Sequence, residues 1–256
     1  MTTVSHLLDA RRISKRFDGI TALDGVSVWV DRGEMVALVG PNGAGKTTLF
    51  DCMAGVLRPD AGTVTVDGVD LHWLAPYQRS RIGLARTFQQ IELFAGLTVL
   101  DHLLVADRAQ RYRGALWRDL LGRSRPTSDE LARCGAVLDL LGLGGDRDRP
   151  VESLTLGRGR VVELARALVC APRLLFLDEP SSGLDADETD HMAAVLERVR
   201  VENDLAILLC EHDVGFVERL ASRAYVLDSG RLIAEGPTAD VLARADVRAA
   251  YLGAGA

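Results

Sequence analysis

The chain has 256 residues, of which 48% are hydrophobic and 26% are charged, and its formal net charge is −6. This balance is typical of a globular protein and excludes a disordered chain, a collagen-like repeat and a coiled-coil rod. The excess of 36 Asp and Glu over 30 Lys and Arg argues against a nucleic-acid-binding protein, because such proteins usually carry a basic surface.

The cysteine and hydropathy patterns indicate a soluble protein of a reducing compartment. The four cysteines are far apart and form no C-x-x-C pair, so we expect neither a zinc site nor a disulfide. No apolar run reaches the roughly 18 residues that a membrane helix needs. The first residues lack the charged and apolar regions of a signal peptide. We therefore expect a cytosolic chain.

The first third of the chain is predicted to be rich in strands. Residues 26–30 form a short apolar strand, and Met35–Val39 is a continuous apolar run that ends at a glycine. Such a run predicts a strand that is buried on both faces, as in a parallel sheet. Residues 49–57 have helical spacing, and residues 63–66 alternate β-branched side chains as a strand does.

The rest of the chain alternates between two patterns. Residues 98–143 have helical periodicity, and Ser128 is the expected N-cap of the second helix there. The last third predicts strands and helices at residues 174–177, 185–200, 206–210 and 214–221, followed by a hairpin at 225–234. Strands that alternate with helices predict a parallel sheet covered by helices, with the helical middle as an insertion.

Residues 40–48, GPNGAGKTT, match the phosphate-binding pattern G-x-x-x-x-G-K-[ST] between a predicted strand and a predicted helix. The glycines allow successive backbone N–H groups to turn toward phosphate oxygens. Lys46 is expected to reach the terminal phosphates, and the Thr47 hydroxyl to bind Mg²⁺. A glycine-rich turn that only closes a loop is the alternative. The predicted nucleotide-binding residues are Gly40, Pro41, Asn42, Gly43, Ala44, Gly45, Lys46, Thr47 and Thr48.

Two acidic residues, Asp178 and Glu179, follow the predicted buried strand at 174–177. A carboxylate at the end of a strand near the phosphate loop can hold Mg²⁺. A second carboxylate beside it can act as a general base toward the attacking water. We therefore predict Asp178 as a metal ligand and Glu179 as the catalytic base. The alternative, a solvated strand end, is disfavoured by the apolar run and by Pro180.

The segment LDEP, followed by SSGLD and by EHD about 30 residues later, resembles the nucleotide-binding domain of ABC transporters. The resemblance covers nearly the whole chain. It implies an α/β P-loop NTPase core with a mainly parallel sheet, an N-terminal antiparallel β part and an inserted helical subdomain. It implies a single ATP-binding domain over residues 1–256, with a core at 1–90 and 166–256 and the helical subdomain at about 91–165. The implied cofactors are ATP and Mg²⁺.

The resemblance also implies roles for single residues. Gln89, in RTFQ, matches the glutamine that contacts the metal and joins the catalytic site to the helical subdomain. His212, in EHD, matches the histidine that contacts the γ-phosphate. Phe17 matches the aromatic residue that stacks on adenine, and Asp185, in SSGLD, matches the loop that crosses the dimer interface. Taken singly, His212 would more often be a surface histidine, Phe17 a core residue and Gln89 a polar loop residue. Their order along the chain, together with the other motifs, favours the roles that the resemblance implies.

The segment LTLGR, residues 154–158, matches the LSGGQ signature of this family but departs from it at two positions. Thr155 keeps a hydroxyl and Gly157 keeps the glycine, and both are expected to contact ATP held by a second subunit. Leu156 replaces a glycine and Arg158 replaces the glutamine. We therefore predict a composite site that is weaker than usual or that works with a different partner subunit.

RTFQ, the LTVL stretch and the ending AYLG resemble the ATP-binding subunit of branched-chain amino-acid importers. Similar subunits serve urea or short-amide importers and lipopolysaccharide exporters, which remain alternatives. The resemblance implies membrane permease subunits, a second ATP-binding subunit of the same or another kind, and indirectly an extracytoplasmic substrate-binding protein. It places the chain on the cytoplasmic face of the membrane, and no nucleic acid is expected as a partner.

Two other classes of protein fit the sequence less well than a transport ATPase does. A soluble ABC protein that acts on ribosomes or DNA usually has two cassettes or a long coiled coil, and this chain has one set of motifs and no sustained heptads. A GTPase needs an N-K-x-D element, which is absent from the sequence. A small-molecule kinase has no need for SSGLD or for the helix that follows LTLGR.

A basic stretch occupies residues 108–125 of this acidic chain. It faces anionic lipid headgroups or permease loops in one interpretation, and it is an ordinary solvated loop in the other. The stretch has a single acid, Asp119, and six arginines, at positions 108, 111, 113, 118, 123 and 125.

Overall fold

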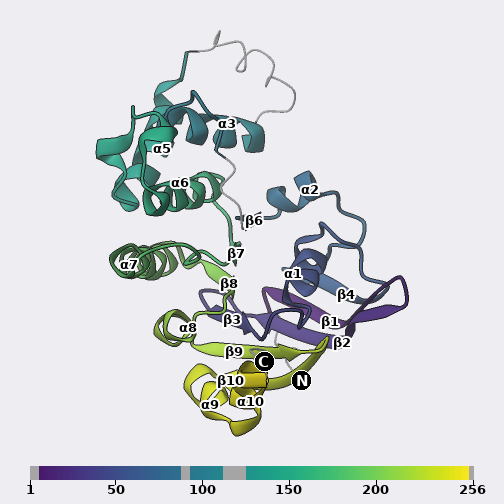
Figure 1. Ribbon diagram of the computed structural model, residues 1–256. Coiled ribbons are helices and arrows are strands. Elements are labelled where there is room, and N and C mark those ends of the chain that lie inside the picture. Colours follow the sequence, from purple (N-terminus) through teal and green to yellow (C-terminus); the bar gives the residue numbers. More distant parts are fainter. Residues whose placement is uncertain (1–5, 88–92, 112–124, 254–256) are drawn as a thin grey trace.

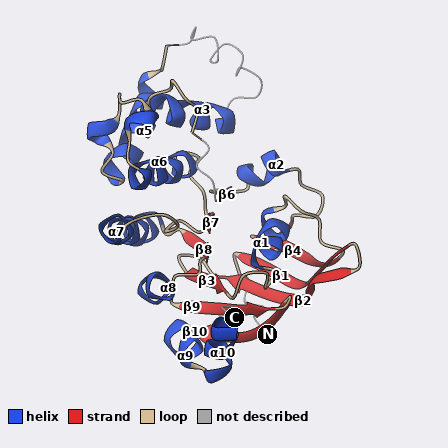
Figure 2. Ribbon diagram, viewed as in Figure 1, coloured by secondary structure: helices blue, strands red, loops and turns tan. Residues whose placement is uncertain are grey.

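The computed structural model describes residues 6–87, 93–111 and 125–253, which form two β-sheets and the helices that cover them (Figure 2). The antiparallel sheet has the order β2 (Ile20–Val30), β1 (Leu8–Phe17), β4 (Ala61–Val66) and β5 (Val69–Asp70). The larger sheet has the order β10 (Arg231–Pro237), β9 (Arg223–Asp228), β3 (Met35–Val39), β8 (Ala206–Cys210), β7 (Leu174–Asp178) and β6 (Leu84–Arg86). All its pairs are parallel except β9 with β10. The predicted fold class is confirmed.

Helices lie on both sides of the larger sheet (Figure 1). The helices of the described residues are α1 (Lys46–Ala54), α2 (Pro76–Arg81), α3 (Val99–Arg111), α5 (Ser128–Leu140), α6 (Leu156–Leu168), α7 (Ala186–Asn203), α8 (Val214–Leu220), α9 (Thr238–Ala243) and α10 (Ala245–Gly253). Two 3₁₀ turns, η1 (Gly144–Asp146) and η2 (Val151–Ser153), lie between α5 and α6. Within the described ranges, no helix has the length and hydropathy of a membrane-spanning segment.

The apolar side chains of the central strands contribute to two cores. Successive side chains of a strand point to opposite faces of a sheet. On β7, Leu175 and Leu177 belong to the core formed with α3 and α5–α8, whereas Leu174 and Phe176 belong to the core formed with α1 and the antiparallel sheet. Figure 1 shows the same division, with α7 and α8 on one side of the strands and α1 on the other.

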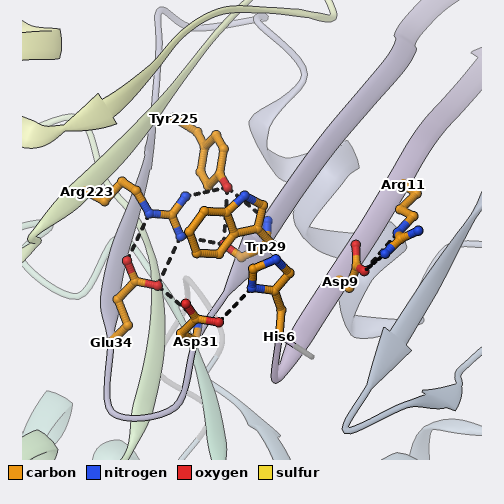
Figure 3. Close-up of polar contacts among 8 residues, drawn as sticks. All are labelled: His6, Asp9, Arg11, Trp29, Asp31, Glu34, Arg223 and Tyr225. Carbon is orange, nitrogen blue, oxygen red and sulfur yellow. Dashed lines mark hydrogen bonds and ion pairs between the residues drawn. The ribbon is translucent and has the colours of Figure 1, made fainter. Parts of the chain in front are cut away.

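A cluster of polar and aromatic side chains joins the two sheets (Figure 3). It lies at the end away from the phosphate loop, because Arg223 pairs with Val36 near the start of β3 and the loop follows the end of that strand. The Arg223 guanidinium lies 3.4 Å from the centroid of the Trp29 ring and donates hydrogen bonds of 2.9 and 3.0 Å to the Glu34 carboxylate. The Trp29 main-chain N–H donates to the Tyr225 hydroxyl at 3.0 Å, and the His6 ring stacks on Trp29 at 4.2 Å. Because Trp29 is on β2 and Arg223 on β9, these contacts fix the first sheet to the second.

The predicted N-cap of α5 was wrong by one residue. Thr127, rather than Ser128, caps the helix, because its hydroxyl accepts from the Glu130 N–H at 3.2 Å. The Glu130 carboxylate in turn accepts from the Thr127 N–H at 2.8 Å. This reciprocal pair needs a spacing of three residues, which Thr127 has and Ser128 lacks.

The first arginine of the basic stretch does not belong to a charged surface. Arg108 is buried and donates two hydrogen bonds, of 2.7 and 3.0 Å, to Glu130. Arg111 pairs with Asp107 at 2.7 Å, and Arg125 is exposed. Neither interpretation of the basic stretch, a face toward lipid or permease or a solvated loop, therefore holds for Arg108. The arginines at 113, 118 and 123 lie outside the described residues.

Candidate active site

The phosphate loop connects the buried strand β3 to α1 and is held by close packing at two glycines. At Gly40, whose φ is 151°, a Cβ atom would lie 2.1 Å from the Leu227 carbonyl oxygen. At Gly45, whose φ is 100°, it would lie 2.6 Å from the Ala22 carbonyl oxygen. At Gly43, by contrast, a Cβ would meet nothing within 4 Å. The outer part of the loop is therefore open, as a phosphate cradle must be.

Lys46 lies inside this loop, with 7% of its surface exposed. Its Nζ donates hydrogen bonds to the carbonyl oxygens of Gly40, at 2.7 Å, and of Pro41, at 2.9 Å. Gly45 is the N-cap of α1, and because glycine has no side chain, no capping side chain bonds to the N–H groups of the first turn. The loop thus places an ammonium group beside a helix N-terminus, an arrangement that attracts phosphate oxygens. Of the other predicted loop residues, Asn42 and Thr47 are exposed and Thr48 is half-buried.

The acidic pair lies at the same edge of the sheet as the phosphate loop. Strand β8 lies between β3 and β7, and its Cys210 is paired with Leu38 on one side and with Asp178 on the other. Burial raises the pKa of the Cys210 thiol. The charge of Asp178 also raises this pKa, and the charge of Lys46 lowers it. The ammonium of the loop and the carboxylate of β7 are therefore near the same side chain.

Asp178 is 5% exposed, and burial raises the pKa of its carboxyl. Arg86, at the end of β6, opposes that shift with a 3.1 Å hydrogen bond to Oδ2 and also pairs with Asp51 of α1. Mg²⁺ prefers oxygen ligands and usually takes one or two carboxylates together with substrate phosphates. The hydroxyl of Thr47 and the carboxylate of Asp178 fit that donor set. Gln89, the third predicted ligand, lies outside the described residues.

Glu179 and His212 face each other across the ends of β7 and β8. The His212 Nδ1 atom lies 3.8 Å from Glu179 Oε1, and 55% of the His212 side chain is exposed. Glu179 has a φ of 46°, a left-handed conformation that costs a non-glycine residue about 1–3 kcal/mol and that is typical of functional sites. Its N–H donates to the Cys210 carbonyl oxygen at 2.9 Å. The Glu179 side chain is 20% exposed, so its carboxylate is accessible to water.

Glu211 is a residue of this region that the sequence analysis missed. It is fully buried and accepts hydrogen bonds from Ser181, just after Glu179, and from the main chain of His212. The sequence pattern that could have identified Glu211 is its position directly after the apolar strand β8. A carboxylate buried at that position needs hydrogen-bond donors around it.

Phe17 is the last residue of β1 and is 43% exposed. It pairs with Ile20 of β2, and the Lys15 ammonium lies 5.5 Å from the centroid of its ring. Ala22, two residues further along β2, packs against Gly45 of the phosphate loop. The structure therefore brings the β1–β2 hairpin that carries Phe17 beside the loop.

Thr155 and Gly157 lie at the N-terminus of α6. The Thr155 hydroxyl accepts from the Arg158 N–H at 3.3 Å and so caps the helix. The Arg158 side chain turns away from this end, to pair with Asp146 and to donate to the Gly142 carbonyl oxygen at 3.0 Å. In the part of the chain that the structure describes, no hydrogen bond or ion pair joins Thr155 or Gly157 to the phosphate loop.

Asp185 caps α7, because its Oδ1 accepts from the Glu188 N–H at 2.8 Å. The Glu188 carboxylate extends to α6 and accepts from the Gly157 N–H at 3.2 Å. The SSGLD segment and the LTLGR segment are thus connected to each other within one chain.

Two family models match the sequence. The model described as ABC transporter matches residues 23–182, and the model described as branched-chain amino acid ATP-binding cassette transporter matches residues 231–256.

Several known proteins are similar over nearly the full length. The chain is 38% identical to the high-affinity branched-chain amino acid transport ATP-binding protein LivG of Salmonella typhimurium, over 96% of this chain and 98% of that protein. With the same coverage it is 33% identical to the protein BraF of Pseudomonas aeruginosa, which carries the same description. A solved ADP conformation of an ATP-binding cassette of an ABC transporter has a TM-score of 0.87 and 28% identity, and covers 98% of this chain and 100% of that one.

Proposed function

The chain belongs to the ABC transporter family, and we propose that within this family it is the ATP-hydrolysing subunit of an importer of branched-chain amino acids. The observation that carries the substrate class is the similarity to two branched-chain amino-acid transport proteins over 96% of the chain, together with the C-terminal match at residues 231–256. These names favour that substrate class over the urea, short-amide and lipopolysaccharide systems that the sequence left open.

In this proposal, hydrolysis depends on positioning and on charge stabilisation. Lys46 and the amides of the phosphate loop hold the phosphates of ATP. Thr47 and Asp178, with Gln89, hold Mg²⁺, which supplies charge neutralisation at those phosphates. Glu179 orients the attacking water and accepts its proton.

The remaining predicted residues complete the site in this proposal. His212 contacts the γ-phosphate, and Phe17 stacks on adenine. Thr155 and Gly157 contact ATP held by a second subunit, with Asp185 at the interface. The lack of described contacts between the α6 N-terminus and the phosphate loop of the same chain supports such a composite site.

The family implies membrane permease subunits as partners. We propose that the chain binds them from the cytoplasmic face of the membrane, through a helical subdomain at about residues 91–165. In this view, residues 1–90 and 166–256 form the nucleotide-binding core of one domain. A substrate-binding protein outside the membrane acts on the chain only through the permease.

The first experiment measures the mass in solution of the Glu179→Gln variant with and without Mg-ATP. Removal of the base should trap the dimer, so we expect ATP to convert monomer to dimer, whereas Lys46→Ala should abolish the effect. A chain that binds ATP and remains monomeric would require a different ATPase subunit as its partner. A wild-type chain that neither binds nor hydrolyses ATP would overturn the proposal.

A second experiment tests the substrate class. The chain is co-purified with its permease subunits, reconstituted in vesicles and supplied with its substrate-binding protein. We expect leucine, isoleucine or valine to stimulate ATP hydrolysis and urea to have no effect. Stimulation by urea alone would contradict the assignment and leave the ATPase assignment intact.

A further inference from the structure

The carboxylate of Glu211 is fully buried and lies between two loops of the active site. Its Oε1 accepts hydrogen bonds from the Ser181 N–H, at 2.9 Å, and from the Ser181 hydroxyl, at 2.5 Å. Its Oε2 accepts from the main-chain N–H groups of His212, at 3.0 Å, and of Asp213, at 3.4 Å. A buried carboxylate is tolerated only when hydrogen bonds offset its desolvation, and these four donors do so.

These bonds connect the segments that carry the two reactive side chains. Ser181 is two residues after Glu179, and His212 directly follows Glu211. The His212 Nδ1 atom lies 3.8 Å from Glu179 Oε1 and 3.7 Å from Glu211 Oε2, so the imidazole is close to both carboxylates. Together with the Glu179 N–H bond to Cys210, the Glu211 bonds hold the end of β7 against the end of β8.

We infer that Glu211 is a positioning residue for ATP hydrolysis, because it fixes the Glu179 carboxylate and the His212 imidazole relative to each other. The inference rests on the proposed function, since it needs Glu179 and His212 to act on ATP. Glu211 itself has no exposed surface with which to contact the nucleotide, so it acts only through the segments that it binds.

The geometry requires a carboxylate rather than an amide. Each oxygen of Glu211 accepts from at least one main-chain N–H, of Ser181 on one side and of His212 on the other. In a Glu211→Gln variant, the amide NH₂ faces one of these N–H groups whichever way the side chain is turned. A buried donor without an acceptor is strongly disfavoured, so one of the two segments must move.

The test measures kcat and the Kd for Mg-ATP on the full chain. We expect Glu211→Gln to lower kcat at least tenfold and to change the Kd less than threefold, because the phosphate loop keeps its contacts. Ser181→Ala removes only the hydroxyl bond and should lower kcat about threefold. If Glu211→Gln does not fold, Ser181→Ala carries the test. The matched control is Glu130→Gln, which removes another buried, hydrogen-bonded carboxylate far from the reacting groups and should leave kcat within twofold of wild type.

Double variants separate positioning from general stability. In a Glu179→Gln background, adding Glu211→Gln should change the residual rate of hydrolysis less than twofold. The reason is that the effects of substitutions on the rate do not add when the residues act as a unit. A kcat within twofold of wild type for Glu211→Gln would overturn the inference. So would a loss of rate in the Glu179→Gln background that equals the loss caused by Glu211→Gln alone. Either result would leave the proposed function intact. Absence of hydrolysis by the wild-type chain would overturn both.

Discussion

The main-chain N–H of Gly157 donates a 3.2 Å hydrogen bond to the carboxylate of Glu188. Gly157 is in the first turn of α6, and Glu188 is in the first turn of α7. A helix N-terminus favours a negative charge, and Glu188 supplies one from the same chain. We propose that this end of α6 contacts the ATP of a second subunit. It therefore already has an anionic partner in its own chain.

Removal of this carboxylate is predicted to favour the ATP-bound dimer. A carboxylate at a helix N-terminus contributes about 0.3–1 kcal/mol. In a Glu179→Gln background with Mg-ATP, Glu188→Ala should therefore lower the Kd of dimerisation about twofold to fivefold, as measured by sedimentation. The control Asp187→Ala removes an equal charge from the same turn without the bond to Gly157. A dimer weakened by Glu188→Ala would show that this side chain supports the interface.

The LTLGR segment is predicted to limit the rate of hydrolysis. Arg158 pairs with Asp146 and turns away from the helix end, so it supplies no charge there. A variant that combines Thr155→Ser, Leu156→Gly and Arg158→Gln should hydrolyse ATP several times faster than wild type in a steady-state assay. Equal rates for the two proteins would contradict the prediction.

Gly40 is predicted to be irreplaceable on steric grounds. Gly40→Ala places a Cβ 2.1 Å from the Leu227 carbonyl oxygen, a backbone atom that cannot move freely, at a φ of 151°. We expect urea unfolding to show a loss of at least about 2 kcal/mol, together with weaker ATP binding. Gly43→Ala is the matched control, because its Cβ meets no atom and only the positive φ opposes it, at about 1–2 kcal/mol. Equal losses of stability in the two variants would show that the backbone φ, rather than the close contact with Leu227, sets the cost of replacing glycine.

The Arg108–Glu130 pair predicts a pH dependence of stability. Its hydrogen bonds lower the pKa of Glu130 from 4.5 to about 2. A lowered pKa in the folded state means that the pair stabilises the fold above pH 4.5 and that this contribution is lost as the pH falls toward 2. Glu130→Gln should cost about 3 kcal/mol at pH 7, since one pKa unit corresponds to about 1.4 kcal/mol.

Urea unfolding at pH 7 and at pH 3.5 checks this prediction. The difference between wild type and Glu130→Gln should shrink at the lower pH, where the wild-type pair is losing its contribution. The exposed neighbour Asp129 provides the control, because Asp129→Asn should cost less than about 0.5 kcal/mol at both values. A pH-independent difference would contradict the assigned role of the ion pair.

Local features were predictable because consecutive residues carry them. The strands β3 and β8 follow from apolar runs, and the loop after β3 follows from the pattern of Gly, Lys and Thr in residues 40–48. By contrast, β1 (Leu8–Phe17) was not predicted, because charged residues such as Arg11 and Lys15 interrupt its pattern. Its pairing with β2 and β4 makes it a strand, and a partner strand is not a local property.

The order of the chemical groups is read directly along the chain: the phosphate loop, the acidic pair at 178–179, the signature segment and His212. These motifs depend on backbone conformation and hydrophobic periodicity, which adjacent residues specify. Folding of the whole chain brings Glu211 to Ser181, 30 residues earlier, and Glu188 to Gly157, 31 residues earlier. Such pairs form because the packing of strands and helices brings distant segments together, and no spacing within the chain encodes that distance.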